Sequence, residues 1–384
     1  MSINKNTILS IGLVIIVYIV SAEVSYALFS RTSKAPVEPS DVASQGTLED
    51  NLPKTEECPL NGKLYSKKQR EWWEKHRPLG VMIENHGEAR PQSGLSSADI
   101  IYEAVAEGAI TRFLAVFYCD DAESIGAVRS ARTYFLDWIS EYGDYPLYAH
   151  VGGANTPGPA NALGQISDYG WNMYNDLSQF NLSYPTFKRV ESPNGRQVAT
   201  EHTMFSTTEE LWKVADQRKL TNVNKDGDKW DADFVEYSFK DDAKEADRPL
   251  SQSIHLEFWE DYGEYAVDWT YDKATNSYKR NNGGKPHMDA KTNKQLTAKN
   301  IIVLTMIESN ANDGYENNLH LLYRNKGTGK ARVFMDGKMI LGTWEKETRT
   351  SRTLIFDGNG EKIEFNKGNL WFEILPTTGV VNVI

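Results

Sequence analysis

The chain has 384 residues, more than the ~250–300 residues at which a single hydrophobic core usually stops growing, so two domains are expected. Hydrophobic residues form 40% of the chain, aromatic residues 11% and charged residues 25%, and this ordinary globular composition restricts expected disorder to ends and linkers. The formal net charge of −11 argues against a nucleic-acid partner, because domains that bind nucleic acids carry a basic footprint.

The N-terminus predicts a membrane-targeting segment over residues 1–30. Lys5 precedes an apolar run from Ile8 to Val20, and mostly small or apolar residues continue to Phe29. As an uncleaved signal-anchor, residues 8–29 just reach the ~20 residues that a transmembrane helix needs. As a cleavable signal peptide, the run is a short apolar core followed by small residues. We favour the anchor, which would hold the body on the extracytoplasmic side of the cell membrane; secretion after cleavage is the alternative.

Residues 31–57 are rich in Ser, Pro, Glu and Asp and contain almost no large apolar side chain, so they cannot offset the entropy cost of folding. We expect a disordered linker there, with ordered structure beginning near Cys58 or Leu60. The segment KKQREWWEKHRP, at residues 67–78, then predicts a short helix that ends before Pro78.

The two cysteines, Cys58 and Cys119, have two interpretations. A chain that meets an oxidising compartment can join them in a disulfide, which would tie the entry segment to the strand FLAVFYC. Alternatively both are free thiols and Cys119 is buried. No histidine spacing near them supports a zinc site.

The first domain is expected over residues 58–220 as a mixed α/β unit. Its patterns predict a buried strand at Pro78–Asn85, a strand at Ile110–Tyr118 and a helix at Ser130–Gly143. The segment between the two strands, LSSADIIYEAVAEG, is either helix or strand. A helix would place Asp99, Glu103 and Glu107 on one face, whereas a strand would mix these acids with Ile101 and Val105 on a single face.

Polar residues of chemical interest are concentrated from Val81 to Arg132, within an apolar, strand-like frame. Arginines can bind a phosphate or carboxylate through two hydrogen bonds, and the acids can act as bases or hold a cation. Two histidines further along the chain are also of interest, one of them just before Gly152-Gly153, where backbone can approach a ligand closely. The candidate ligand-binding residues are Asn85, Arg90, Gln92, Asp99, Glu103, Glu107, Arg112, Arg129, Ser130, Arg132, His150 and His202.

The alternative interpretation of these residues is structural. The same arginines and acids can pair with one another as an internal lattice of ion pairs that orients the strands. A strand, a turn and a helix would also place Arg129, Ser130 and Arg132 at a helix N-terminus, where backbone N–H groups favour anions. Sequence spacing alone does not decide between these interpretations. No motif for a metal or cofactor is present, and none is expected.

Residues 221–384 predict a second, β-rich domain, organised as a small barrel or sandwich. Short runs that alternate apolar and polar residues are separated by turn pairs such as Asp336-Gly337 and Asn359-Gly360. The predicted fold class is therefore α+β, with a mixed N-terminal domain, a β-rich C-terminal domain and an N-terminal membrane helix.

Several of these segments resemble the signature of the YerB-like lipoprotein family, catalogued as domain of unknown function 3048. The resemblance is carried in the first half by ARPQSGLSSADIIYE, EGAITRFLAVF, IGAVRSAR, LYAHVGG and EHTMFST, and in the second half by WTYDKATNSYKRNNGGKPHMDAKTNKQLTAKNIIVL, GTGKARVFMDGKMILGTWEK and FDGNGEKIEFNKGNLWFEILP. It covers about residues 77–376. It implies an extracytoplasmic, membrane-tethered protein with two α+β parts, and it implies no established reaction.

Two departures from the family pattern matter. Family members have Pro-His-Asn where this chain has Glu201-His202-Thr203, so His202 is carried over but its following neighbour is not. Relatives also have a lipid-modified cysteine after the leader, which this chain lacks, so its tether would be protein.

Two classes of function fit these observations. In the first, an Arg-rich cleft of the first domain binds an anionic cell-envelope component, such as a cell-wall glycan or polymer. In the second, the same cleft belongs to an envelope hydrolase or transferase acting on a phosphate-linked or glycan substrate. A structural scaffold for an envelope protein partner is a further alternative. We favour binding, because the sequence offers anion ligands but no clear pair of nucleophile and base.

Overall fold

The computed structural model describes residues 52–384. The membrane anchor expected over residues 1–30 and most of the expected linker lie outside these residues. Within residues 52–384, no helix combines the length and the apolar character that a membrane crossing requires. This part of the chain belongs to one compact unit.

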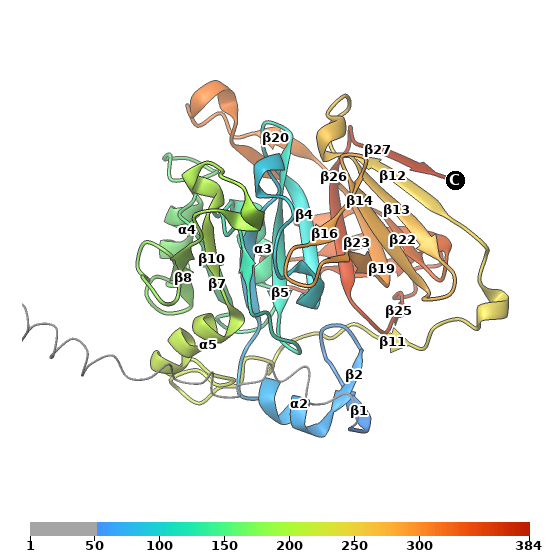
Figure 1. Cartoon of the computed structure of the whole chain (residues 1–384), viewed down its shortest axis with the longest axis horizontal. Helices are drawn as coiled ribbons and strands as arrows, with labels where there is room; N and C mark the ends of the chain where they lie inside the picture. The colour runs from blue at the N-terminus through green and yellow to red at the C-terminus, as the bar shows by residue number, and fades with distance from the viewer. Residues whose placement is uncertain (1–51) are drawn as a thin grey trace, which may run out of the picture. The chain divides into compact units, whose positions relative to one another are not determined.

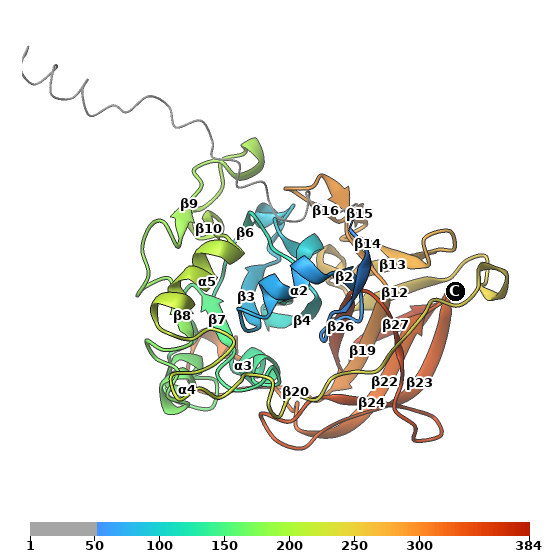
Figure 2. The same cartoon turned by 90° about the horizontal axis from the view of Figure 1, so that it is seen from below.

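A small N-terminal unit begins the described chain (Figures 1 and 2). Strand β1 (Lys54–Glu57) pairs with β2 (Leu64–Ser66), and α2 (Lys67–Trp73) follows directly. The Ser66 side chain caps this helix by accepting from the Gln69 amide. Residues 54–57, expected as the end of a disordered linker, therefore form a strand. The physical reason is its antiparallel pairing with β2, together with an ion pair of 2.8 Å between Arg70 Nη1 and Glu56 Oε2.

A ten-stranded mixed sheet forms the centre of the molecule (Figure 1). Its strands, in spatial order, are β24 (Leu354–Asp357), β23 (Lys338–Lys346), β22 (Gly327–Met335), β19 (Asn300–Met306), β26 (Leu370–Pro376), β4 (Ile100–Glu107), β5 (Ile110–Phe117), β3 (Leu79–Glu84), β7 (Leu147–His150) and β8 (Asp176–Ser178). Strand β26 pairs in parallel with both β19 and β4. The sheet therefore passes without interruption from the first expected domain into the second.

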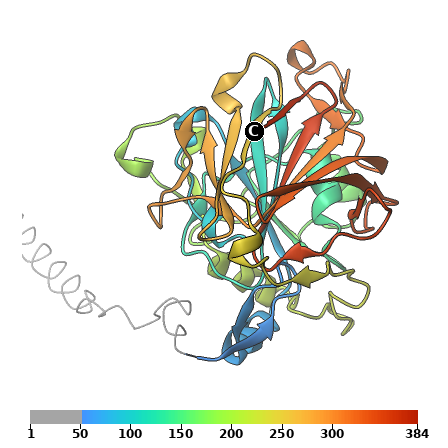
Figure 3. The same ribbon diagram turned by 90° about the vertical axis from the view of Figure 1, so that its right-hand side faces the viewer.

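A smaller sheet lies in the C-terminal half and contains β15 (Lys285–Pro286), β14 (Ser277–Asn282), β13 (Val267–Asp272), β12 (Ser253–Glu257) and β27 (Val380–Val383), with β18 (Thr297–Ala298) paired to β14. Leu256 and Trp269 of this sheet share a hydrophobic core with Ile301 and Trp371 of the large sheet. Figure 3 shows the gold strands of the smaller sheet near the central strands of the large one. The prediction of a β-rich C-terminal half is confirmed.

The opposite face of the large sheet packs against helices. Helix α3 (Thr133–Ile139) contributes Phe135 and Trp138 to a core with Tyr102 of β4 and Phe372 of β26, and α4 (Ala162–Asp168) adds Ile166. Helix α5 (Thr208–Gln217) joins the other core, where Leu211 and Trp212 are buried. These three helices, together with α2 and the large sheet, give the described chain a mixed α/β architecture.

Short two- and three-stranded pairings complete the fold. They are β6 (Ile125–Gly126) with β10 (Met204–Ser206) and β9 (Lys188–Arg189), β11 (Phe239–Lys240) with β25 (Phe365–Asn366), β16 (Met288–Asp289) with β17 (Lys294–Gln295), and β20 (Glu308–Asn310) with β21 (Leu321–Tyr323). The β16–β17 hairpin is important below because it packs against the segment that precedes β4.

The ambiguous element of the sequence is strand β4. Ile101, Glu103 and Val105 share one face of the strand, since both apolar residues belong to the core under the smaller sheet. A tight turn at Gly108 and Ala109, with φ of 56° and 66°, leads directly into β5. Positive φ at both central residues matches the twist of a two-residue hairpin.

Candidate functional site

The carboxyl ends of β3, β4 and β7 lie at the same edge of the sheet, because β3 pairs in parallel with β7 and both β3 and β4 run antiparallel to β5. Glu84 ends β3, Glu107 ends β4 and His150 ends β7. This topology brings polar residues that are far apart in the sequence to one region of the fold.

Three arginines in this region form what we call the arginine cluster: Arg112, Arg129 and Arg132 with the carboxylates of Glu84 and Glu107. Glu107 pairs with Arg112, at 3.2 Å between Oε1 and Nη2, and its other carboxylate oxygen binds Arg132. Arg129 Nε donates to Glu84 Oε1 at 3.1 Å. Ser130 contributes its carbonyl oxygen, which accepts from Arg112 Nη1 at 2.9 Å. Each arginine therefore has a carboxylate partner within the protein.

The charge of Glu107 shows how strongly this pairing acts. Burial raises the pKa of this carboxyl, but Arg112 and Arg132 outweigh burial and lower the pKa to about 2. Arg132 is the residue before the first turn of α3, a helix of seven residues, so this predicted anion ligand does lie at a helix start. Its anionic partner there is the Glu107 carboxylate.

His202 contacts the arginine cluster through Glu84. Its Nδ1 lies 2.7 Å from Glu84 Oε2, and its Nε2 lies 3.6 Å from Glu88 Oε2. The ring stacks on His86 at 4.7 Å between centroids. The buried Glu84 carboxylate thus holds both an arginine and a histidine in fixed orientations.

A second group, which we call the buried polar network, lies on the other face of β4. Arg280 of β14 donates to Glu103 Oε2 at 2.5 Å and to Glu373 Oε1 at 3.1 Å, and all three side chains are fully buried. Burial raises the pKa of the Glu373 carboxyl well above its ordinary value, and nearby Glu103 raises it further. Two acids therefore share one guanidinium, with Glu373 favouring its neutral form.

Amide and imidazole groups extend the buried polar network. Arg280 Nε donates to His287 Nδ1 at 3.0 Å, and His287 Nε2 contacts Gln92 Oε1 at 2.7 Å. The Gln92 amide in turn donates to Asn85 Oδ1 at 2.9 Å, and Asn85 donates to Thr111 Oγ1 at 2.7 Å. Gln92 and Glu103 therefore make buried contacts with the second half of the chain, and Asn85 supports Gln92 from within the first half.

A pocket of about 540 Å³, which we call the cationic pocket, opens at the end of this network. Its lining includes Arg90 and Arg196 from the first half, Lys285 and the buried His287 from the second, and a single carboxylate residue, Glu264. Arg90 donates to the backbone oxygens of Asn85 and Glu264, and Arg196 to backbone oxygens of Glu88 and Arg90. Within residues 52–384, Arg90, Arg196 and Lys285 have no carboxylate within ion-pair distance.

The chain was compared with known proteins. The model described as "Protein of unknown function (DUF3048) N-terminal domain" matches residues 64–221, and the corresponding C-terminal domain matches residues 254–372. The chain belongs to the DUF3048 family. It is also similar to "Putative lipoprotein YerB" of Bacillus subtilis, with 27% identity over 328 residues that cover 85% of this chain and 88% of the relative. The crystal structure of the YerB protein from Bacillus subtilis has a TM-score of 0.67 and 24% identity, and the match covers 85% of this chain and all of that one.

The large sheet contains strands from both matched regions. The candidate residues divide among separate surroundings. Glu107, Arg112, Arg129 and Arg132 belong to the arginine cluster, to which Ser130 contributes its carbonyl oxygen and which His202 contacts through Glu84. Asn85, Gln92 and Glu103 belong to the buried polar network, and Arg90 lines the cationic pocket.

Asp99 and His150 lie apart from these groups. The Asp99 carboxylate accepts from the amides of Tyr118 and Cys119 at 2.7 and 3.0 Å, beside the disulfide that the structure contains between Cys58 and Cys119. Burial raises the pKa of Asp99 to about 7. His150 is fully buried, with Nε2 at 2.7 Å from Asp176 Oδ1 and Nδ1 at 2.6 Å from the Gly152 oxygen.

The described residues contain one candidate group for metal ligation. The group of His, Cys, Asp and Glu side chains close enough to share one ion there consists of Cys58, Asp99 and Cys119. The two sulfurs of that group are bonded to each other in the structure, so they do not offer thiolate ligands.

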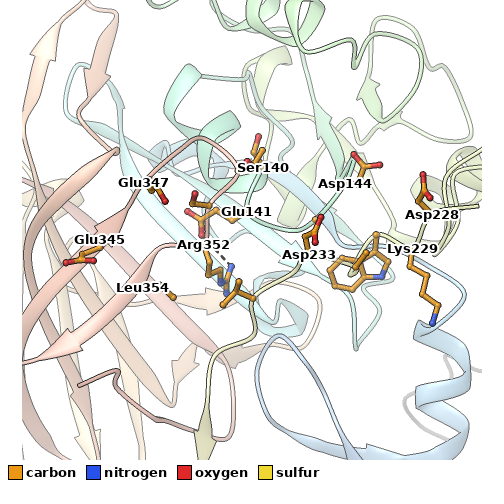
Figure 4. Close-up of a pocket in the computed structure, with 16 residues that line it drawn as sticks. Ser140, Glu141, Asp144, Asp228, Lys229, Asp233, Glu345, Glu347, Arg352 and Leu354 are labelled. Atoms are coloured by element: carbon orange, nitrogen blue, oxygen red, sulfur yellow. Dashed lines mark hydrogen bonds and ion pairs between the residues drawn. The ribbon is translucent and has the colours of Figure 1, made fainter. Parts of the chain in front are cut away.

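A further pocket, of about 800 Å³, lies elsewhere and is acidic (Figure 4). Its lining carries six carboxylate residues against two cationic ones, and Glu141 is already paired with Lys346 at 2.8 Å and with Arg352 at 3.5 Å. The guanidinium of Arg352 lies over the rings of Tyr237 and Tyr142, at 4.1 and 4.7 Å from their centroids. These cation–π contacts and the Glu141 carboxylate explain why the Arg352 side chain is buried in the core.

Sequence reasoning missed five charged residues that are central to these sites: Glu84, Arg196, Arg280, Lys285 and Glu373. Arg280 lies in the mostly polar strand SYKRNN, which looks like a solvent-facing strand until the large sheet covers one of its faces. Glu373 is the one charged residue of the apolar, fully buried strand LWFEILP, and that isolated charge was an available signal. Lys285 follows Gly283-Gly284 in a turn, a setting in which backbone can approach a ligand closely. That turn was the available signal for the cationic pocket.

Proposed function

We propose that this DUF3048 protein binds an anionic component of the cell envelope, such as a cell-wall polymer, in the cationic pocket. The single observation that carries the proposal is the set of three cations, Arg90, Arg196 and Lys285, that line one cavity without a carboxylate partner among residues 52–384. Like charges that converge repel each other, and an anionic ligand removes this repulsion.

The pocket has the chemistry of an anion site in other respects. Burial and the neighbouring Arg280 and Arg90 lower the pKa of His287 well below its ordinary value, so this ring adds no charge and can only exchange hydrogen bonds. Arg90 stacks over the Tyr265 ring at 5.0 Å and is held by the Asn85 backbone oxygen, which fixes its planar group in place. A fixed guanidinium loses little freedom when it binds a phosphate or carboxylate.

An envelope location for this binding is supported by three features. The similar Bacillus subtilis protein is named a putative lipoprotein. The N-terminal sequence has the composition of a membrane anchor, and Cys58 and Cys119 form a disulfide, which is typical of extracytoplasmic proteins. We place the body outside the cytoplasm on these grounds.

The hydrolase or transferase alternative has less support. The pair of Glu84 and His202 has the form of a base oriented by a carboxylate, at 2.7 Å. Among the described residues, however, no hydroxyl or thiol group forms a hydrogen bond with His202. The scaffold alternative accounts for the arginine cluster and the buried polar network, in which every arginine has a carboxylate partner. It leaves the three unpaired cations unexplained.

The test compares two double variants of the full-length chain by titration calorimetry with inorganic phosphate and with purified anionic wall polymer. Arg196→Gln/Lys285→Gln removes two cations of the pocket, and we expect at least a tenfold loss of affinity, which is ~1.4 kcal/mol. Arg324→Gln/Lys330→Gln is the matched control, because both residues are exposed and neither lines this pocket. Equal affinity in the two variants contradicts the proposal.

A further inference from the structure

A second basic cavity, of about 550 Å³, lies beside the N-terminal hairpin, and we call it the lysine pocket. Four lysines line it: Lys63, Lys294, Lys299 and Lys367. They come from the loop between β1 and β2, from β17, and from the segments that precede β19 and β26. Segments from both halves of the chain therefore converge on one cationic cavity.

Two of these lysines, Lys63 and Lys294, have no carboxylate in ion-pair distance within the described chain. The Lys63 ammonium lies over the Tyr65 ring, 4.8 Å from its centroid. The other two are paired: Lys299 binds Asp242 at 2.5 Å, and Lys367 binds Asp241 at 3.1 Å. Lys63 and Lys294 are both exposed, so a ligand can reach them.

The two carboxyl residues that line the lysine pocket are outnumbered by its four lysines. Burial raises the pKa of Asp99 to about 7 and that of Asp120 to about 6, while Lys63 acts in the opposite direction on both. At pH 7 Asp120 is therefore mostly ionised, whereas Asp99 is about half ionised. The Asp99 carboxylate is also occupied by two backbone amides and by Asn61 Nδ2 at 2.5 Å. The two acids thus offset only part of the positive charge of the lining.

The lysine pocket and the cationic pocket lie at two ends of one seam between the halves of the chain. Pro91 and Met288 line the cationic pocket, whereas Ser96 and Thr292 line the lysine pocket. Thr292 is four positions after Met288, and a fully extended chain spans at most about 14 Å over four residues. The facing edges of the two pockets are thus close enough for one ligand to reach both.

Hydrogen bonds join the two halves of the chain between the pockets. Asp289, fully buried, accepts from the amides of Gly94 and Ser96 at 3.0 Å each, and the Ala290 amide donates to the Gln92 oxygen at 2.8 Å. The hairpin of β16 and β17 is therefore fixed to the segment before β4. The spacing of the two pockets is a fixed property of the fold.

We propose that the lysine pocket is a second anion site and that the ligand of this face is a chain polyanion carrying repeated phosphate groups, bound at both pockets together. This inference rests on the proposed function for one of its two sites. Binding at two linked sites raises the affinity for a long chain above that for a single phosphate, because the second contact forms within the complex. A nucleic acid fits less well, since Tyr65 is the aromatic residue available for base stacking in the lysine pocket.

The test measures binding of the full-length chain to inorganic orthophosphate and to long-chain inorganic polyphosphate at equal ionic strength. We expect wild-type protein to bind polyphosphate at least tenfold more tightly than orthophosphate. Lys63→Gln/Lys294→Gln should lose this preference for the chain and keep the orthophosphate affinity of the cationic pocket. Lys330→Gln/Lys338→Gln, which changes two exposed lysines of the large sheet by the same charge, should behave as wild type.

The remaining outcomes separate the two proposals. If Lys63→Gln/Lys294→Gln keeps the preference for polyphosphate, the proposal that the lysine pocket binds anions is wrong, even when Arg196→Gln/Lys285→Gln loses binding of orthophosphate. If polyphosphate binding depends on Lys63 and Lys294 but not on Arg196 and Lys285, the lysine pocket is confirmed as an anion site and the proposed function of the cationic pocket is wrong. Lysine-dependent binding to phosphatidylglycerol vesicles, with none to polyphosphate, would overturn the polymer as the ligand and indicate a lipid headgroup.

Discussion

The arginine cluster and the cationic pocket are both built around the segment that follows β3, but their charges are arranged in opposite ways. Glu84, at the end of β3, pairs with Arg129 of the cluster, whereas the partners of Arg90, six residues later, are backbone oxygens, the Asn85 side-chain oxygen and an aromatic ring, with no carboxylate in ion-pair distance among residues 52–384. In the cluster, Glu107 joins Arg112 to Arg132. In the pocket, Arg196 and Lys285 have no such carboxylate among residues 52–384.

This difference indicates which cations are available to a ligand. A cation with a buried carboxylate partner contributes to folding, and removing either partner leaves an uncompensated charge. A cation without a counter-ion contributes little to folding and leaves its charge for a ligand. The comparison therefore predicts two distinct phenotypes: loss of stability for the paired cations and loss of binding for the unpaired ones.

The largest loss of stability is expected for Arg280→Met, which removes the cation between Glu103 and Glu373. Two fully buried acids would then lack their partner, and breaking a buried ion pair in this way costs about 3–5 kcal/mol. Chemical denaturation of the full-length chain measures the change. Lys279→Met is the control, because Lys279 is the preceding residue of β14 and its side chain is half exposed; a loss as large as that of Arg280→Met would contradict the argument.

Carboxyl groups show the same contrast between paired and unpaired charge. Asp99 has no ion-pair partner among the described residues, whereas Glu107 has two. Burial raises the pKa of Asp99 from 3.8 to about 7. The folded state therefore holds a proton more tightly than the unfolded state, and the free energy of unfolding should fall as pH rises from about 4 to 7, by up to ~4 kcal/mol.

Asp99→Asn tests this pH dependence. The variant keeps an oxygen that can accept from the amides of Tyr118 and Cys119, but it does not titrate. We expect its free energy of unfolding to change less than that of wild type between pH 4 and 7. Identical pH profiles for the two proteins would show that Asp99 stays ionised throughout.

Glu107 is expected to show the opposite pH behaviour. Its two arginines lower its pKa from 4.5 to about 2, so its contribution to stability is present above about pH 4.5 and is lost as pH falls through 2. Glu107→Gln should destabilise the protein by ~1–3 kcal/mol at pH 7, because Arg112 and Arg132 lose a charged acceptor. The difference from wild type should shrink in acid, and a difference that is constant from pH 7 to pH 2 would contradict the assigned pairing.

Much of the local structure could be predicted from the sequence. The strands at Leu79–Glu84 and Ile110–Phe117 and the helices at Lys67–Trp73 and Thr133–Ile139 are confirmed within a few residues, because each has a clear apolar period bounded by turn residues. The joining of the halves could not be predicted. It depends on β26 entering the sheet beside β4, a parallel pairing across more than 260 residues that leaves no local pattern.

The candidate site shows the same limit. The sequence places its arginines and acids in one short stretch, but a carboxylate partner is found only in space: Arg280 reaches Glu103 from a strand 177 residues away. Strand alternation does separate Glu103 from Arg112, since the two side chains lie on opposite faces of the sheet, with different cores. Arg196 and Lys285 have no spacing that connects them with Arg90, so the cationic pocket becomes visible only in the folded chain.

The smallest effect on stability is expected for Arg196→Gln/Lys285→Gln, and it is the sharpest test of the comparison. Both side chains are exposed and neither has an ion pair in the described chain, so each change should alter the free energy of unfolding by less than ~0.5 kcal/mol. A thermal denaturation curve without ligand measures this, and the same curve with phosphate measures binding, because a ligand that binds only the folded state raises its stability. Wild type should be stabilised by phosphate and the double variant should not. A double variant that is already destabilised without ligand would show that these cations stabilise the fold. That result would contradict the claim that only cations with a carboxylate partner contribute to stability.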